Sequence, residues 1–98
     1  MKNYHFCISS DNEIIFRSEI DYIRGFNTLA LSLAQTGSLL SAEAFMSTHL
    51  HVCVRTDDIY MLINRFWRSY TRYFNAKYCR KGNLGGQPFI LEIDGFHH

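Results

Sequence analysis

Residues 39–55 of the sequence, LLSAEAFMSTHLHVCVR, decide the fold. Two β-strands are predicted within this stretch, at residues 39–46 and 49–55. Only Ser47 and Thr48 separate them, so an antiparallel hairpin is the simplest connection. The hairpin divides the chain into two flanks of similar length, and each flank carries one further strand and one helix.

On the N-terminal side, residues 2–9 alternate like a strand that has three large apolar residues on one face: Tyr4, Phe6 and Ile8. Ser18 is a candidate N-cap for a helix that runs to about Gln35, and Gly37 is a typical residue to end it. Within this helix, residues recur at helical spacing at the following positions: Ile20, Ile23, Asn27, Ala30, Leu31 and Ala34.

On the C-terminal side, Asp57 or Asp58 is expected to start a second helix that runs to about Cys79. Residues 82–88 contain three glycines and a proline and predict a turn, and residues 89–93 predict a last strand. The resulting order, β-α-β-β-α-β, predicts an α+β, ferredoxin-like fold. Such a fold has an antiparallel sheet with two helices on one face.

Composition limits the class of protein. A chain of 98 residues with 47% hydrophobic and 19% charged residues fits one folded domain over residues 1–98 and excludes extensive disorder. Its apolar runs are far shorter than the roughly 20 residues that span a bilayer, and no leader sequence opens the chain. Three cysteines without a C-x-x-C pair fit reduced thiols, so we expect a cytoplasmic protein without a membrane partner.

Charge is unevenly distributed. Residues 63–81 contain no acidic residue and carry the following basic side chains: Arg65, Arg68, Arg72, Lys77, Arg80 and Lys81. The first three fall on one side of the second helix, opposite a stripe expected to be buried: Tyr60, Ile63, Trp67, Tyr70, Phe74 and Tyr78. The basic side is either a solvated helix face or a surface that contacts the phosphates of a nucleic acid.

His49 and His51 are the candidate metal ligands. Residues two apart on a strand face the same side, about 6.5–7 Å apart, so both imidazoles can reach one divalent ion. Leu50 between them faces the helices. Alternatively, the histidines are ordinary surface residues of an open sheet face, because two nitrogen donors alone do not complete the coordination of a hard ion.

Three segments together resemble the REP-associated tyrosine transposases, which belong to the HUH class of single-tyrosine, single-strand DNA transposases. Residues 45–54, FMSTHLHVCV, are similar to the Met-x-x-His-hydrophobic-His segment of that family. Residues 14–22, IIFRSEIDY, are similar to the opening of its first helix. Residues 69–75, SYTRYFN, followed by a basic stretch and Gly82, are similar to its second helix. The resemblance covers roughly residues 4–96.

This resemblance implies a ferredoxin-like catalytic domain in which His49 and His51 bind Mg²⁺ or Mn²⁺. It also implies that the metal polarises a phosphate of single-stranded or hairpin DNA while a tyrosine attacks it, forming a 5′-phosphotyrosyl link. Related single-tyrosine enzymes form dimers, so the resemblance is also consistent with a homodimer of this chain. The basic residues at 65–81 would then contact the DNA.

The sequence departs from the family where the nucleophile should be. The family carries its tyrosine, and a polar metal ligand four residues later, on a further helix that would begin where this sequence ends, at residues 94–98. We therefore expect a C-terminally truncated domain that does not cleave DNA, with Tyr73 as the only candidate nucleophile left within the chain. Two other readings are a non-catalytic module that binds single-stranded nucleic acid and a ligand-binding or regulatory ferredoxin-like domain.

Overall fold

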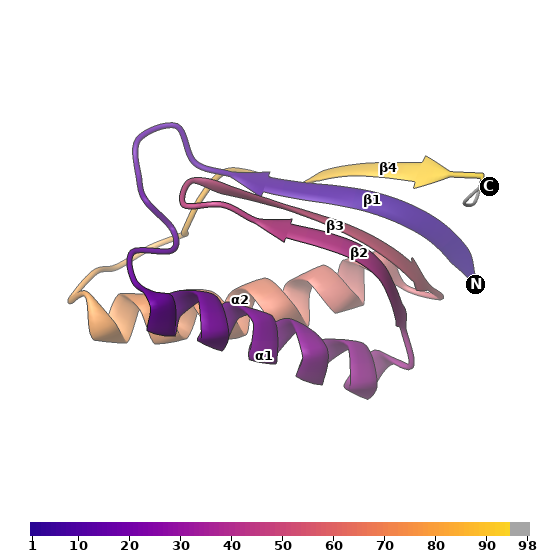
Figure 1. Ribbon diagram of the computed structural model, residues 1–98, viewed down its shortest axis with the longest axis horizontal. Coiled ribbons are helices and arrows are strands. Elements are labelled where there is room, and N and C mark those ends of the chain that lie inside the picture. Colours follow the sequence, from indigo (N-terminus) through magenta and orange to yellow (C-terminus); the bar gives the residue numbers. More distant parts are fainter. Residues whose placement is uncertain (95–98) are drawn as a thin grey trace.

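A computed structural model describes residues 1–94, and it contains the predicted elements in the predicted order (Figure 1). They are β1 (Lys2–Ser9), α1 (Glu19–Thr36), β2 (Leu39–Phe45), β3 (His49–Thr56), α2 (Ile59–Lys77) and β4 (Phe89–Ile93). The α+β, β-α-β-β-α-β prediction is confirmed. Residues 95–98, where the further helix of the transposases would begin, lie outside the described residues.

The four strands form one antiparallel sheet in the order β2-β3-β1-β4. Both helices pack against the same face of this sheet and leave the other face open (Figure 1). The central pair, β1 and β3, aligns Cys7 with His51 and Ser9 with His49. Because directly opposed residues share a face, this register decides which side chains of β1 surround the histidines.

Polar residues fix the helix ends. The Ser18 side chain accepts a hydrogen bond from the backbone amide of Asp21 at 3.2 Å, and Gly37 ends α1 with a φ of 63°. Of the two candidate aspartates, Asp58 is the N-cap of α2 and accepts from the Met61 amide at 3.0 Å. Within residues 1–94, neither helix combines the length and the apolar character that crossing a bilayer requires.

The buried face of α2 supplies much of the core. Its buried residues are Ile59, Leu62, Ile63, Phe66, Trp67, Tyr70 and Phe74. They pack against fully buried residues of β1 and β3, among them Phe6 and Val52. The predicted stripe is wrong at one position: Tyr60 is 72% exposed, because Ile59 rather than Tyr60 turns towards the sheet in the first turn of α2.

The apolar residues that recur along α1 mark a helix correctly but face solvent, with Ile20 64% and Leu31 59% exposed. The helix instead buries smaller and polar residues: Asp21, Gly25, Leu29, Ser32 and Leu33. Gly25 is required there because a β-carbon at this position would lie 2.6 Å from Cε1 of Phe16. A pattern of apolar spacing cannot reveal a face that packs through a glycine and two polar side chains.

Candidate metal centre and nucleic-acid interface

The two histidines of β3 lie on the open face of the sheet. Leu50 and Val52 are fully buried on the helix side, and the alternation of the strand therefore turns His49 and His51 the other way. Both are half-buried, and their ring centroids are 5.3 Å apart with the ring planes nearly perpendicular. The two imidazoles are thus adjacent and accessible, as the spacing predicts.

His5 of β1 joins this pair, which the sequence alone did not indicate. Its Nε2 lies 3.0 Å from Nδ1 of His51, within hydrogen-bonding distance, and Cys7 Sγ lies 4.0 Å from Nε2 of the same ring. His5 and Cys7 alternate with the buried Phe6 on β1. That alternation predicts which face they occupy, but only the register of β1 with β3 brings them to His51.

Among the described residues, Nε2 of His49 has no hydrogen-bonding partner, whereas Nε2 of His51 lies 4.0 Å from the Cys7 thiol, a weak partner that a metal ion would replace. Nδ1 of His51 pairs with His5, and Nδ1 of His49 lies 3.3 Å from the Thr48 hydroxyl. Burial lowers the pKa of His51, and the neighbouring His5 and His49 lower it further, which favours the neutral ring that metal binding needs. Metal-binding histidines commonly engage their second nitrogen in this way.

The donor set favours some ions over others. Among residues 1–94, no three His, Cys, Asp or Glu side chains are placed to hold a metal ion together, so His49 and His51 form a two-donor site. Mg²⁺ prefers oxygen ligands, whereas imidazole nitrogens suit transition-metal ions. Two imidazoles alone therefore leave most of the coordination of a hard ion to water or phosphate oxygens.

An exposed aromatic side chain lies two strands away from the histidines. Phe89 of β4 is directly opposite Cys7 in the sheet and is 62% exposed. Directly opposed residues share a face, so the Phe89 side chain lies on the open face, in line with Cys7 and His51. An unpaired base can stack on such a ring.

The arginines of α2 form a separate surface on the helix side. Arg65, Arg68 and Arg72 are all exposed. Arg65 reaches the Gln35 side chain at 3.5 Å, and within residues 1–94 the other two make no hydrogen bond to protein. No acidic residue occurs in α2, and the three guanidinium groups are therefore available to an anionic partner.

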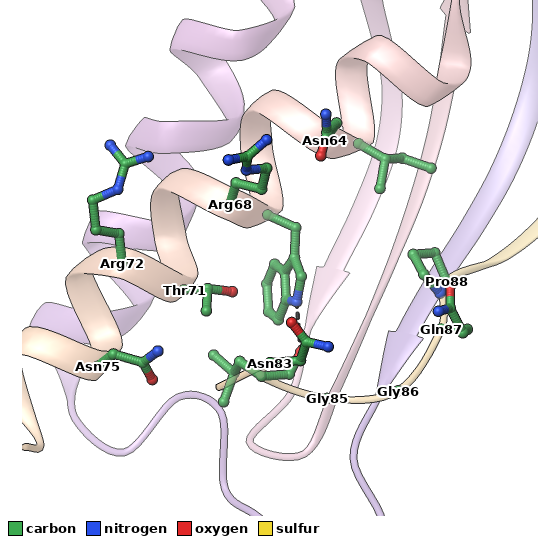
Figure 2. Close-up of a pocket in the computed structure, with 13 residues that line it drawn as sticks. Asn64, Arg68, Thr71, Arg72, Asn75, Asn83, Gly85, Gly86, Gln87 and Pro88 are labelled. Carbon is green, nitrogen blue, oxygen red and sulfur yellow. Dashed lines mark hydrogen bonds between the residues drawn. The ribbon is translucent and has the colours of Figure 1, made fainter. Parts of the chain in front are cut away.

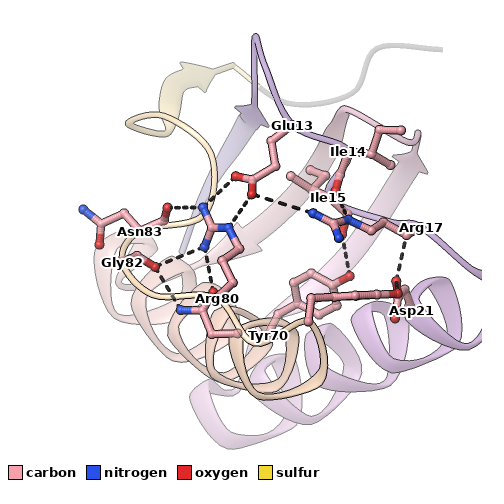
Figure 3. Close-up of polar contacts among 11 residues, drawn as sticks. Glu13, Ile14, Ile15, Arg17, Asp21, Tyr70, Arg80, Gly82 and Asn83 are labelled. Atoms are coloured by element: carbon pink, nitrogen blue, oxygen red, sulfur yellow. Dashed lines mark hydrogen bonds and ion pairs between the residues drawn. The ribbon is translucent and has the colours of Figure 1, made fainter.

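Arg80 has a structural role, and its assignment to the DNA surface stays a prediction. Its guanidinium pairs with the Glu13 carboxylate through two hydrogen bonds, one of them 2.6 Å between Nη2 and Oε1 (Figure 3). It also donates to the Asn75 side chain and to the carbonyls of Gly82 and Asn83, at 2.7, 3.3 and 2.8 Å. Since these contacts use all five donors, Arg80 holds the loop after α2.

Lys77 is likewise engaged, whereas Lys81 is exposed. Lys77 Nζ lies 2.8 Å from the carboxylate of Asp21, a fully buried residue. That carboxylate accepts three further hydrogen bonds, from the Tyr73 hydroxyl at 2.6 Å, the Tyr78 hydroxyl at 2.5 Å and the Arg17 amide at 2.9 Å. Burial raises the pKa of Asp21, but these hydrogen bonds outweigh burial and hold the pKa well below its usual value.

Tyr73, the candidate nucleophile, lies far from the histidines in the fold. Tyr73 is on α2, on the helix side of the sheet, and its hydroxyl donates to Asp21. Burial and this hydrogen bond raise the pKa of Tyr73, which makes its phenolate harder to form. The sheet separates Tyr73 from His49 and His51.

A groove of about 680 Å³ runs between α2 and the loop that leads to β4 (Figure 2). Arg68 and Arg72 lie on its α2 side, and Asn83 and Gln87 lie on its loop side (Figure 2). Trp67 contributes to the apolar floor. None of the described residues that line this groove is acidic.

Comparison with known proteins supports the fold. No protein-family model matches the sequence, and no curated protein is similar to it in sequence. Among solved structures, a protein from Deinococcus radiodurans R1 described as a transposase is similar, with a TM-score of 0.74 and 16% sequence identity. That match covers 94% of this chain and 78% of the other.

A second similar structure is a REP-associated tyrosine transposase bound to a REP hairpin, with a TM-score of 0.71 and 13% identity. The match covers 97% of this chain and 58% of the transposase, so this chain spans little more than half of that protein's length. At these identities the comparisons establish a shared α+β fold.

Proposed function

We propose that this chain is a transposase-type domain that binds single-stranded or hairpin DNA and supplies the metal-binding half of a DNA cleavage and rejoining site. The observation that carries the proposal is the histidine pair on the open sheet face, where each Nδ1 has a hydrogen-bonding partner. Nε2 of His49 has no partner among residues 1–94, and Nε2 of His51 meets only the weakly bonding Cys7 thiol at 4.0 Å. The fold shared with a transposase bound to a REP hairpin supports the same function.

His49 and His51 would hold a divalent ion, Mg²⁺ or Mn²⁺, through their Nε2 atoms, with the Cys7 thiol displaced from His51. When bound, such an ion polarises the phosphate and stabilises the charge that develops in phosphoryl transfer. Phe89 would stack an unpaired base on the same face of the sheet, because its exposed side chain lies two strands from His51, opposite Cys7. On the helix side, Arg65, Arg68 and Arg72 would bind the phosphates of the same DNA.

Cleavage needs an attacking oxygen in line with the leaving group, and the tyrosines of residues 1–94 do not offer one at the histidines. Tyr4 faces the core side of β1, where it pairs with Val54, and the remaining tyrosines lie on α1, on α2 or at the C-cap of α2. We therefore propose DNA and metal binding without cleavage for this chain.

The second candidate is a non-catalytic module that binds single-stranded nucleic acid. The two-donor histidine site favours it, because no third ligand from residues 1–94 completes the coordination. The two candidates differ in whether metal binding belongs to the function.

Titration with Mn²⁺, followed by calorimetry and by electron paramagnetic resonance, tests the proposal. We expect wild-type protein to bind Mn²⁺ with nitrogen hyperfine coupling and His49→Ala and His51→Ala to lose most of the affinity. Cys53→Ser, also on β3 and half-buried, is the matched control and should bind as wild type does. Equal Mn²⁺ affinity in all four proteins would remove the histidines from the function and favour the non-catalytic module.

The homodimer and the cytoplasmic location stay predictions. Light scattering after size exclusion, with and without a hairpin oligonucleotide, measures the first. Fractionation of cells that express the chain measures the second.

A further inference from the structure

The groove between α2 and the loop at residues 82–88 is a built feature, because several hydrogen bonds fix its two walls to each other. Trp67 Nε1 donates to the Leu84 carbonyl at 2.7 Å, and the Asn75 side chain donates to the Gly82 carbonyl at 2.9 Å. Arg80 adds hydrogen bonds to the Asn75 side chain on α2 and to the Asn83 carbonyl in the loop, and these bonds hold the loop against the helix. A ligand would find this groove already formed.

The far end of the same loop is bound to the sheet. The Gly86 amide donates to the Ser9 carbonyl at 2.8 Å, and Ser9 is the cross-strand partner of His49. Gly85 adopts a φ of 72°, and a β-carbon there would lie 3.2 Å from the Ser9 carbonyl oxygen. The loop that forms one wall of the groove therefore reaches the end of the sheet at which the histidines lie.

The lining of the groove combines three kinds of groups. Arg68 and Arg72 supply positive charge on one side, and Asn83 and Gln87 supply amides on the other (Figure 2). The floor is apolar and includes Trp67, only 9% of whose surface is exposed. Guanidinium groups bind phosphate, amides pair with the edges of bases, and an apolar floor accepts the face of a base.

The size of the groove selects a small unit of nucleic acid. Its volume of about 680 Å³ falls within the roughly 300–1,000 Å³ typical of small-molecule sites. Such a volume suits an unpaired nucleotide rather than the broad surface that a duplex covers. The absence of acidic side chains among the described lining residues agrees with an anionic ligand.

We propose that this groove binds an unpaired nucleotide of single-stranded DNA. The phosphate lies against Arg68 and Arg72, the base lies over the Trp67 floor, and Asn83 and Gln87 read the edge of the base. This proposal rests on the DNA binding of the proposed function. It adds where one nucleotide binds and that the site distinguishes between the four bases. The strand leaves the groove along the loop towards Ser9 and the histidine face.

Fluorescence anisotropy with labelled oligonucleotides of dA, dC, dG and dT tests this assignment in the full chain. We expect wild-type protein to prefer one base by at least about fivefold, as amide recognition of a base edge allows. Asn83→Ala with Gln87→Ala should reduce that preference to less than about twofold and leave the salt dependence of binding unchanged. Thermal unfolding of each variant shows whether the loop is still folded.

The arginines should behave differently from the amides. Arg68→Ala with Arg72→Ala should weaken binding to all four oligonucleotides by roughly tenfold, and each lost phosphate contact should make the salt slope less negative by about 0.7. Arg55→Ala is the matched control, because Arg55 is an exposed arginine of β3 outside the groove lining and should have little effect on affinity.

Two results would overturn the assignment. If wild-type protein binds single-stranded DNA but the amide and arginine variants bind it equally well, the groove is not the site and Arg68 and Arg72 do not contact the DNA, while DNA binding by another surface of the chain stands. If wild-type protein binds no DNA at all, the proposed function fails and the groove assignment fails with it.

Discussion

Nε2 of His5 lies 3.0 Å from Nδ1 of His51 across the central strand pair of the sheet. This contact fixes the orientation of the His51 ring, so that its second nitrogen points away from His5. Neighbours that orient a metal-binding histidine in this way strongly affect metal affinity, although they do not touch the metal themselves. His5 is therefore a positioning residue of the proposed metal site.

We expect His5→Phe to lower the affinity for Mn²⁺ roughly 10- to 100-fold, because the His51 ring loses the partner of its Nδ1. His5→Gln, whose amide can still hydrogen-bond, should retain more of the affinity. Calorimetric titration with Mn²⁺ measures both. A His5→Phe protein that binds Mn²⁺ as tightly as wild type would show that the ring of His51 needs no support from β1.

Asp21→Asn should destabilise the protein by about 2–4 kcal/mol at pH 7, because a fully buried carboxylate that accepts four hydrogen bonds becomes an amide with fewer acceptors. Urea unfolding followed by circular dichroism measures this loss. Glu19→Gln, at an exposed position of the same helix, is the control for removing one carboxylate from the first turn of α1.

The same carboxylate predicts a pH dependence. Hydrogen bonding holds the folded-state pKa of Asp21 below the unfolded value of about 3.9, so the folded protein binds fewer protons there. Its stabilising contribution is present above about pH 4 and is lost as the pH falls towards the folded-state pKa. The difference in unfolding free energy between wild type and Asp21→Asn should therefore shrink below pH 4. A difference that stays constant down to pH 2.5 would contradict the assignment.

Gly25→Ala should destabilise the protein by roughly 1–2 kcal/mol. Alanine favours a helix over glycine by about 1 kcal/mol, but overpacking a core costs about 1–3 kcal/mol. The new methyl group would lie 2.6 Å from the Phe16 ring, which cannot move easily because Tyr22, Phe45 and Tyr70 pack around it. Chemical denaturation gives the sign. A stabilised Gly25→Ala protein would mean that α1 shifts away from Phe16 without penalty.

The chain of 98 residues should form no covalent link with DNA. Labelled hairpin DNA incubated with Mn²⁺ and protein, then separated on a denaturing gel, should show no shifted band, because Tyr73 is bound to Asp21 on the helix side of the sheet. A covalent band that disappears in Tyr73→Phe would show that this tyrosine reaches the phosphate after all. A band that survives in Tyr73→Phe would point to another nucleophile in the chain.

Sequence alone predicted the helices and strands well, because residues close in sequence, such as Ser18, Gly37 and Asp58, determine where the helices begin and end. It also placed His49 and His51 on one face, since alternation is a local property of a strand.

Interactions between distant residues were not predictable in this way. His5 meets His51 only through the β1–β3 register, and Arg80 meets Glu13 from 67 residues away. A run of basic residues does not reveal which of its charges are paired with acids elsewhere in the chain. Metal and DNA binding stay predictions, because the fold fixes the positions of the side chains and not their ligands.

The separation of the two sides of the sheet has a further consequence, because histidines lie on one side and arginines on the other. The histidines are on the open face and the arginines are on α2, with fully buried residues such as Val52 and Phe66 between the two. If the histidines bind an ion and the arginines bind DNA, as proposed, substitutions on the open face of β1 and β3 would change the first property without touching the residues of the second. Residues on each surface could then be exchanged independently, because neither set belongs to the buried core between them.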